Sequence, residues 1–131
     1  MNFSKTTSYA ITILHFLAVH REERFSAKKL NQELGIPWPY LRQLLTALSK
    51  EGLIDSMQGR SGGFTLQHDP SGITLNQIVE AVEGKDSFRK CIMGFKDCPF
   101  DHQCAMHSVW EDSRKTIQKV LNETTLSNLI K

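Results

Sequence analysis

Residues 35–66 read GIPWPYLRQLLTALSKEGLIDSMQGRSGGFTL, and this stretch decides the fold. Leucines recur through its first half at spacings of three and four, which predicts a helix over about residues 39–50. Either Pro37 or Pro39 can occupy the first helical turn without losing a hydrogen bond, and Gly52 ends the helix. The side chains that this helix would bury are Leu41, Leu44, Leu45 and Leu48.

A shorter helix is predicted just upstream, over residues 27–34. Ser26 would cap its start, and Gly35 supplies the left-handed residue that ends it. Its apolar residues, Leu30 and Leu34, would face inward. Two helices joined by a short turn that contains glycine form the helix-turn-helix signature, although any helical hairpin gives a similar pattern.

The second half of the quoted stretch predicts a β-hairpin. Residues 53–57 alternate as a strand does, residues 64–67 return as a second strand, and residues 58–63 form a glycine-rich tip. A helix-turn-helix followed at once by such a hairpin is a winged helix. Arg60 supplies the cation that a narrow minor groove attracts. Its alternative role is a solvated turn residue, and the preceding helix pair favours DNA contact.

Helical patterns also flank the winged helix. Residues 6–20 carry an apolar face, with Thr6 or Thr7 as the expected cap. A capping box predicts a further helix over about residues 75–82, with its apolar side chains inward. The two residues of this box are Thr74 and Gln77.

From about Ala105 the helical period returns for some seventeen residues, which is long for so small a domain. Its stripe could pack within the same chain or form the seam of a homodimer. The seam is favoured, because helix-turn-helix proteins usually bind DNA as two-fold dimers. The predicted seam residues are Val109, Trp110, Ser113, Ile117, Val120 and Leu121.

All three cysteines lie between these last two helices, in CIMGFKDCPFDHQCAMH over residues 91–107. The spacing C-x6-C-x5-C-x2-H gives a soft donor set that suits zinc or an iron–sulfur cluster, although zinc knuckles more often have shorter gaps. Plain buried cysteines, or a redox disulfide with one spare thiol, are the non-metal alternatives. The candidate ligands are Cys91, Cys98, Cys104 and His107, with His102 ranked below His107.

The composition fits one soluble domain, or a small domain with an appended helix. The chain has 131 residues, 40% hydrophobic and 23% charged, with a net charge of +2. No segment approaches the roughly 20 apolar residues that cross a bilayer, so we expect a cytoplasmic protein. Clustered cysteines in that compartment more often bind metal or react with oxidants than form structural disulfides. No nucleophile–base pair or phosphate loop stands out, so we do not expect an enzyme or a small-molecule substrate.

The chain resembles the Rrf2 family of bacterial winged-helix regulators, which includes an iron–sulfur cluster regulator and a nitric-oxide-sensitive repressor. The resemblance runs nearly end to end, and the wing together with the three cysteines makes it specific. The motifs that carry it are SYAITILHFLA, GIPWPYLRQLLTALSKEGLI, GRSGGFTL, ITLNQIVEAVEG, the three cysteines, and HSVWEDSRKTIQKVLNETTLSNLI.

The resemblance implies a homodimer joined through the long helix, and control of genes for cluster assembly, iron, sulfur or nitrosative stress. It also implies a cluster on Cys91, Cys98 and Cys104. His107 as fourth ligand would favour a 2Fe–2S cluster, with a 4Fe–4S cluster or zinc as alternatives. Ser8 stands where 4Fe–4S nitric-oxide sensors have an acidic ligand, which weakens that version.

Three departures from the cluster-assembly regulator alter these expectations. The first cysteine gap is one residue longer, so the ligand geometry cannot be carried over. Arg42 stands where that regulator has a base-reading glutamate, and Gln58 where its wing has an arginine. Arg42 could contact guanine or phosphate, so we expect a different operator sequence.

Together these patterns predict a mainly α protein. Residues 1–84 form a winged helix-turn-helix domain with a two-stranded wing, residues 85–107 a cysteine-rich loop, and residues 104–131 a dimerisation helix with a C-terminal turn.

The expected function is regulation of transcription through a cluster that senses redox state, iron or nitric oxide; the alternative is a zinc-stabilised or thiol-redox regulator without a cluster. The expected partners are double-stranded DNA and a second copy of the chain, with no membrane. The predicted DNA contacts are Ser26, Lys28, Pro39, Tyr40, Arg42, Gln43, Gln58, Arg60, Ser61 and Gly62.

Overall fold

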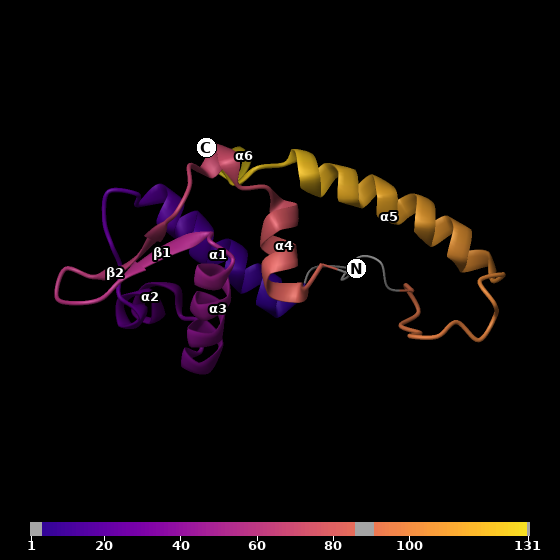
Figure 1. Cartoon of the computed structure of the whole chain (residues 1–131), viewed down its shortest axis with the longest axis horizontal. Helices are drawn as coiled ribbons and strands as arrows, with labels where there is room; N and C mark the ends of the chain where they lie inside the picture. Colours follow the sequence, from indigo (N-terminus) through magenta and orange to yellow (C-terminus); the bar gives the residue numbers. More distant parts are fainter. Residues whose placement is uncertain (1–3, 86–90, 131) are drawn as a thin grey trace.

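The computed structural model of the chain describes residues 4–85 and 91–130, and Figure 1 shows their arrangement. Residues 86–90 of the predicted cysteine loop therefore lie outside the described residues. The helical and hairpin elements predicted from the sequence are all present, with boundaries within two residues of those expected. The fold is mainly helical with a two-stranded wing, as predicted.

The cap of helix α1 (Lys5–Val19) lies two or three residues before the expected one. The hydroxyl of Ser4 accepts the Thr7 N–H at 3.2 Å, so the prediction of Thr6 or Thr7 as the cap is wrong. Thr7 is instead fully buried, and its hydroxyl donates to Oε1 of Glu83 at 2.8 Å. The Ser4 hydroxyl also donates to Glu83, so one carboxylate ties the start of α1 to the end of α4.

The helix-turn-helix consists of α2 (Ala27–Leu34) and α3 (Trp38–Lys50). Ser26 caps α2 by accepting the Lys29 N–H at 3.1 Å, and Gly35 ends it in the left-handed conformation with φ 67°. Leucines of α1, α2 and α3 share one apolar core. Its fully buried members on these helices are Ala10, Ile13, Leu14, Leu17, Leu30, Leu41 and Leu48.

The wing consists of antiparallel strands β1 (Ile54–Met57) and β2 (Gly63–Leu66). Ile54 lies opposite Leu66, and both are buried, so the base of the wing belongs to the core. The tip between the strands is exposed apart from Gly62, which is half-buried. The wing therefore projects from the core on a fixed base.

A short 3₁₀ helix η1 (Pro70–Gly72), which the sequence did not predict, leads into α4 (Leu75–Glu83). The predicted capping box of α4 is confirmed, with Thr74 accepting the Gln77 N–H and Gln77 accepting the Thr74 N–H.

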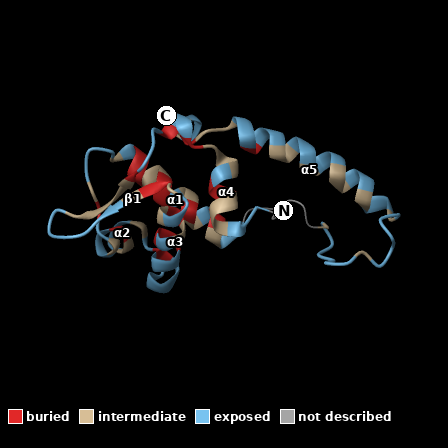
Figure 2. Ribbon diagram, viewed as in Figure 1, coloured by how far each residue is buried: buried red, intermediate tan, exposed pale blue. Residues whose placement is uncertain are grey.

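Helix α5 (Ala105–Glu123) reaches away from the core, and the cysteine loop lies beyond its far end (Figure 1). Among its residues only Leu121 is buried. In Figure 2, nearly all of α5 is coloured as exposed or intermediate. Among the described residues, no helix combines the length and the apolar character needed to cross a membrane.

The chain then returns to the core through α6 (Leu126–Leu129), which packs against η1 and α1. The Leu126 N–H donates to the Ile73 carbonyl at 2.8 Å, and the Leu75 N–H donates to the Thr124 carbonyl at 2.9 Å. Leu126 is fully buried, whereas Leu129 is 40% exposed. The C-terminal end of α5 is thus fastened to the winged helix.

Candidate metal centre and nucleic-acid interface

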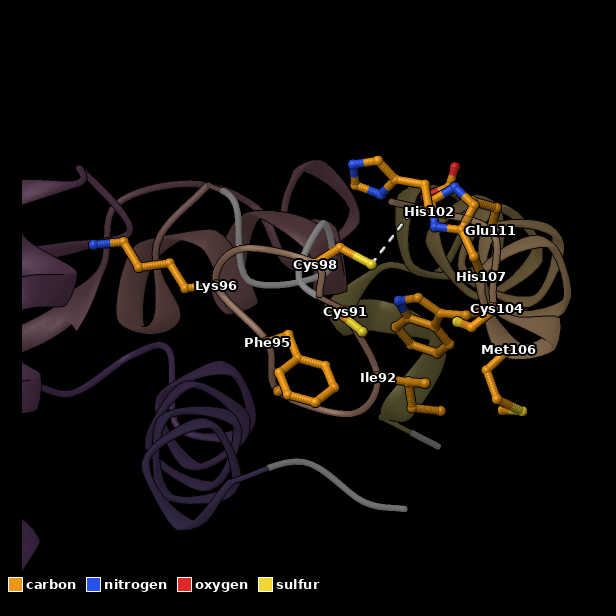
Figure 3. A pocket seen from close by; sticks show the side chains of 12 residues that line it. Cys91, Ile92, Phe95, Lys96, Cys98, His102, Cys104, Met106, His107 and Glu111 are labelled. Carbon is orange, nitrogen blue, oxygen red and sulfur yellow. Dashed lines mark hydrogen bonds between the residues drawn. The ribbon is translucent and has the colours of Figure 1, made fainter. Parts of the chain in front are cut away.

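The three cysteines and His107 line a single cavity of about 560 Å³ at the far end of α5. Cys91 and Cys98 come from the loop, whereas Cys104 is the residue that precedes the first turn of α5. All three are free, half-buried thiols. Figure 3 shows their sulfur atoms directed into the cavity from opposite sides. The side chains predicted as ligands from spacing alone are therefore brought to one place.

The loop between Cys98 and Cys104 contains a backbone turn with two left-handed residues. Asp101 and His102 both adopt the left-handed conformation, with φ 52° and 62°, which is uncommon for residues other than glycine. This turn directs the His102 N–H toward Sγ of Cys98 at 3.3 Å (Figure 3). Hydrogen bonds from backbone N–H groups to sulfur are among the contacts that set the properties of iron–sulfur sites.

His102 lies closer to the candidate centre than sequence reasoning suggested. Its ring centroid is 5.0 Å from that of His107, and both side chains line the cavity. The sequence ranked His102 low because it has no helical spacing to a cysteine. The left-handed turn that brings it there leaves no periodic signal in the sequence.

The donor chemistry fits a soft metal, but the donors do not yet share one centre. Within residues 4–85 and 91–130, no three His, Cys, Asp or Glu side chains converge as a metal-binding group. Coordination of one centre by these residues would therefore require a change in the shape of the loop. Thiolate and imidazole donors suit zinc and iron–sulfur clusters, so the residue types support either.

Glu111 also lines the cavity, but its carboxylate already has a partner. Arg114 donates to it at 2.9 Å, and this hydrogen bond lowers the pKa of Glu111 below its ordinary value. The paired carboxylate is a poorer candidate ligand than the thiols.

Exposed apolar side chains surround the cysteine cavity and continue along α5. Phe95 and Phe100 form an edge-to-face pair with centroids 6.0 Å apart, yet they are 41% and 51% exposed. On α5, Val109 and Val120 are 57% and 55% exposed. Such a concentration of exposed apolar area usually marks an interaction surface.

The predicted DNA contacts on α3 form an exposed outer face. Tyr40 is 45% exposed and packs edge-to-face on Tyr9, with centroids 5.8 Å apart. The guanidinium of Arg42 lies 6.0 Å from the centroid of the Trp38 ring, at the outer limit of a cation–π contact. The remaining predicted contacts on the two helices are also exposed, namely Ser26, Lys28, Pro39 and Gln43.

At the wing tip, Gln58, Arg60 and Ser61 are exposed, as DNA contact would require. Gly62 has a structural reason to be glycine, because a Cβ there would lie 2.1 Å from the Met57 carbonyl oxygen. Its N–H donates to the Gly59 carbonyl at 3.1 Å, which closes the turn. The tip therefore presents Arg60 on a tight backbone turn.

The fold and these exposed faces define a winged helix-turn-helix protein that carries a cysteine loop on a long helix. A family model described as an iron-dependent transcriptional regulator, Rrf2, matches residues 3–131. The chain therefore belongs to the Rrf2 family, and it is a DNA-binding transcriptional regulator rather than an enzyme.

Three similar proteins illustrate the range of the family. The regulator IscR of Yersinia pseudotuberculosis is 30% identical over 99% of this chain and 79% of its own length. The solved structure of IscR from T. potens has a TM-score of 0.79 at 30% identity, covering 99% of this chain and 86% of that one. The structure of CymR, titled the global cysteine regulator of B. subtilis, has a TM-score of 0.79 at 29% identity, covering 98% and 95%.

Proposed function

We propose that this regulator binds DNA as a homodimer, and that an iron–sulfur cluster held by Cys91, Cys98 and Cys104 controls its affinity. The observation that carries the proposal is the single cavity lined by three free thiols and His107. The description of the matching family as iron-dependent and the similarity to IscR support it.

A bound cluster would supply a centre whose charge and integrity respond to oxidants, nitric oxide and iron supply. Cys104, at the start of α5, is fixed by the helix, whereas Cys91 and Cys98 would approach it by movement of the loop. The His102 N–H at Sγ of Cys98 would stabilise the thiolate there. Either His107 or His102 would complete the ligand set.

The proposed dimer uses the apolar stripe of α5. Val109 and Val120 leave more than half of their surface to solvent, and Ile117 lies between them, half-buried. An amphipathic helix that extends beyond its own domain commonly buries its apolar face against a second copy of the chain. Leu121, another predicted seam residue, is already buried within one chain, with 5% of its surface exposed. It would therefore add little buried area to the dimer interface.

In the DNA complex, α3 would enter the major groove with Tyr40, Arg42 and Gln43 foremost. The wing would place Arg60 in the adjacent minor groove. A two-fold dimer would present two such pairs of elements to two half-sites. The cysteine loop connects α4 to α5, so a change in its shape would alter the relation between the DNA-binding part and the dimer helix.

Anaerobic purification followed by visible absorption spectroscopy and analysis of iron, sulfide and zinc tests the cofactor. We expect visible absorption with iron and sulfide bound. One zinc per chain without sulfide would select the zinc alternative. A protein that stays colourless after incubation with iron and sulfide would contradict the cluster.

A thiol-redox regulator without metal is the second candidate. The half-buried, free state of all three cysteines favours it, as does the similarity to a regulator titled for cysteine. This candidate predicts that peroxide changes the DNA affinity of rigorously metal-free protein, and that a thiol reductant reverses the change. The cluster proposal predicts no such response in the metal-free protein.

A further inference from the structure

One connecting segment, residues 20–26, joins α1 to α2, and it also holds the base of the wing. The Arg24 side chain reaches two wing residues at once. Its Nη2 pairs with Oδ2 of Asp55 on β1 at 2.8 Å, and its Nη1 donates to the Gly63 carbonyl at 3.3 Å. The Arg24 side chain is only 26% exposed, so these contacts are partly shielded from solvent.

The next residue fastens the same place through its backbone. The Phe25 N–H donates to the Phe64 carbonyl at 3.1 Å, and the Phe64 N–H donates to the Phe25 carbonyl at 2.7 Å. Gly63 has φ 134°, and a Cβ there would lie 2.7 Å from the Phe25 carbonyl carbon. Glycine at this position allows the segment and the wing to approach so closely.

Ser26, which caps α2, follows directly. The wing is thus joined to the helix-turn-helix through three consecutive residues, which act as side-chain clamp, backbone bridge and helix cap. Among the described residues, no hydrogen bond joins the tip of the wing, beyond the paired strands, to the rest of the fold. Because Arg60 lies at the tip, a small rotation at the base of the wing moves it by a larger distance.

We propose that Arg24 is a positioning residue for DNA binding, which sets the direction of the wing relative to α3 without itself contacting DNA. An arginine suits this role because its planar fork can donate to two acceptors at once, whereas lysine carries a single ammonium. The inference rests on the proposed contact of the wing with the minor groove.

The test uses the full-length protein and a DNA duplex selected by the wild-type protein from a random-sequence pool. Hydroxyl-radical footprinting reports minor-groove contact by the wing, and methylation interference at guanine N7 reports major-groove contact by α3. Arg24→Ala should weaken binding by about tenfold, the size of one lost contact, and should erase the wing footprint while the α3 contacts remain.

Arg21→Ala is the matched control. It removes the same charge from the same segment, but Arg21 is more exposed and, within the part of the chain that the structure describes, pairs with Asp69 alone, at 3.4 Å. It should weaken binding by less than about threefold and leave the wing footprint intact. Arg24→Lys should recover part of the loss seen in Arg24→Ala.

Asp55→Asn separates positioning from direct charge effects. Removal of a negative charge from a DNA-binding protein should tighten binding if electrostatics alone matter. The clamp predicts the opposite, a loss of about threefold, because Arg24 loses its ionised partner. This variant also carries the test if Arg24→Ala fails to fold.

Two results would overturn the inference. One is tighter DNA binding by Asp55→Asn, and the other is a wing footprint that survives in Arg24→Ala. If the wild-type footprint shows no minor-groove protection at all, the proposed wing contact itself fails and the inference fails with it. Cofactor content is expected to be unchanged in every variant, so these failures are distinct from failure of the cluster.

Discussion

The winged helix and the segment that we call the cysteine arm, residues 91–123, satisfy their side chains in different ways. In the winged helix, apolar residues such as Leu14 and Leu41 are fully buried, and serine hydroxyls cap the starts of α1 and α2. In the arm only Leu121 is buried, while Phe100 and Val109 are more than half exposed. The apolar side chains of the winged helix therefore pack against one another. Those of the arm remain exposed and are suited to packing against another molecule. Figure 2 shows the contrast directly.

The largest expected effect tests the self-sufficiency of the winged helix. Leu14→Ala removes a fully buried side chain and should lower the free energy of unfolding by about 2–5 kcal/mol. Val19→Ala in the same helix is the control, because Val19 is 51% exposed and should cost less than about 0.5 kcal/mol. Urea unfolding followed by circular dichroism measures both. Equal losses would show that α1 does not support the core as described.

The next effect tests the arm as a dimer seam. Val109→Asp would place a carboxylate in the proposed interface and should weaken dimerisation by on the order of 2 kcal/mol, or about thirtyfold. Asn122→Asp introduces the same charge at another exposed position of α5 and should leave the dimer nearly unchanged. Analytical ultracentrifugation distinguishes them. A Val109→Asp protein that dimerises like the wild type would place the seam elsewhere.

A smaller effect concerns a contact inside the winged helix, between the start of α1 and the end of α4. Thr7→Val keeps the shape of a buried side chain but removes the hydroxyl that donates to Glu83 at 2.8 Å. We expect a loss of about 1 kcal/mol, the usual size of one buried hydrogen bond. Thr12→Val is the control, since the Thr12 hydroxyl donates only to the Ser8 carbonyl on the exposed face of α1. No difference between the two variants would contradict the structural role given to Glu83.

The smallest effect is the pH dependence that Asp69 contributes to the stability of the winged helix. The backbone N–H of Ser71 donates to Asp69, and this hydrogen bond is the largest cause that lowers the pKa of Asp69 below its ordinary 3.8. A lowered folded-state pKa stabilises the fold above pH 3.8, and that contribution is lost as the pH falls through the folded value. Asp69→Asn should therefore make the fall of the unfolding midpoint at acid pH slightly shallower, since the other carboxylates still titrate. An unchanged acid limb would contradict this role.

The same contrast explains what could be predicted from the sequence. Helix caps, leucine spacing and the glycine-rich tip are local signals, and they placed the winged-helix elements within two residues. Ser4 was missed because three neighbouring hydroxyl residues have equal capping chemistry. The choice depends on Glu83, which is 76 residues from Thr7 in the sequence. The contacts of Arg24 and Phe25 with the wing are equally non-local, so no spacing rule reveals them.

In the arm, the sequence predicted which residues lie around the candidate site, but not the backbone conformation that brings them there. Cysteine spacing identified Cys91, Cys98 and Cys104, and the structure places them around one cavity. The left-handed turn at Asp101 and His102 has no glycine to mark it, so the position of His102 was not foreseen. Residue type and spacing suit both zinc and an iron–sulfur cluster, so the sequence does not distinguish between them.

The most direct test of the account measures DNA affinity in two states of the protein. The wild type and a variant with Cys91, Cys98 and Cys104 all changed to serine are titrated with the selected duplex after anaerobic treatment with iron and sulfide, and again after chelation. The account predicts that the wild-type dissociation constant changes by about tenfold or more between the two states, while that of the serine variant stays constant. An equal change in both proteins would contradict control of DNA binding by the cysteine centre.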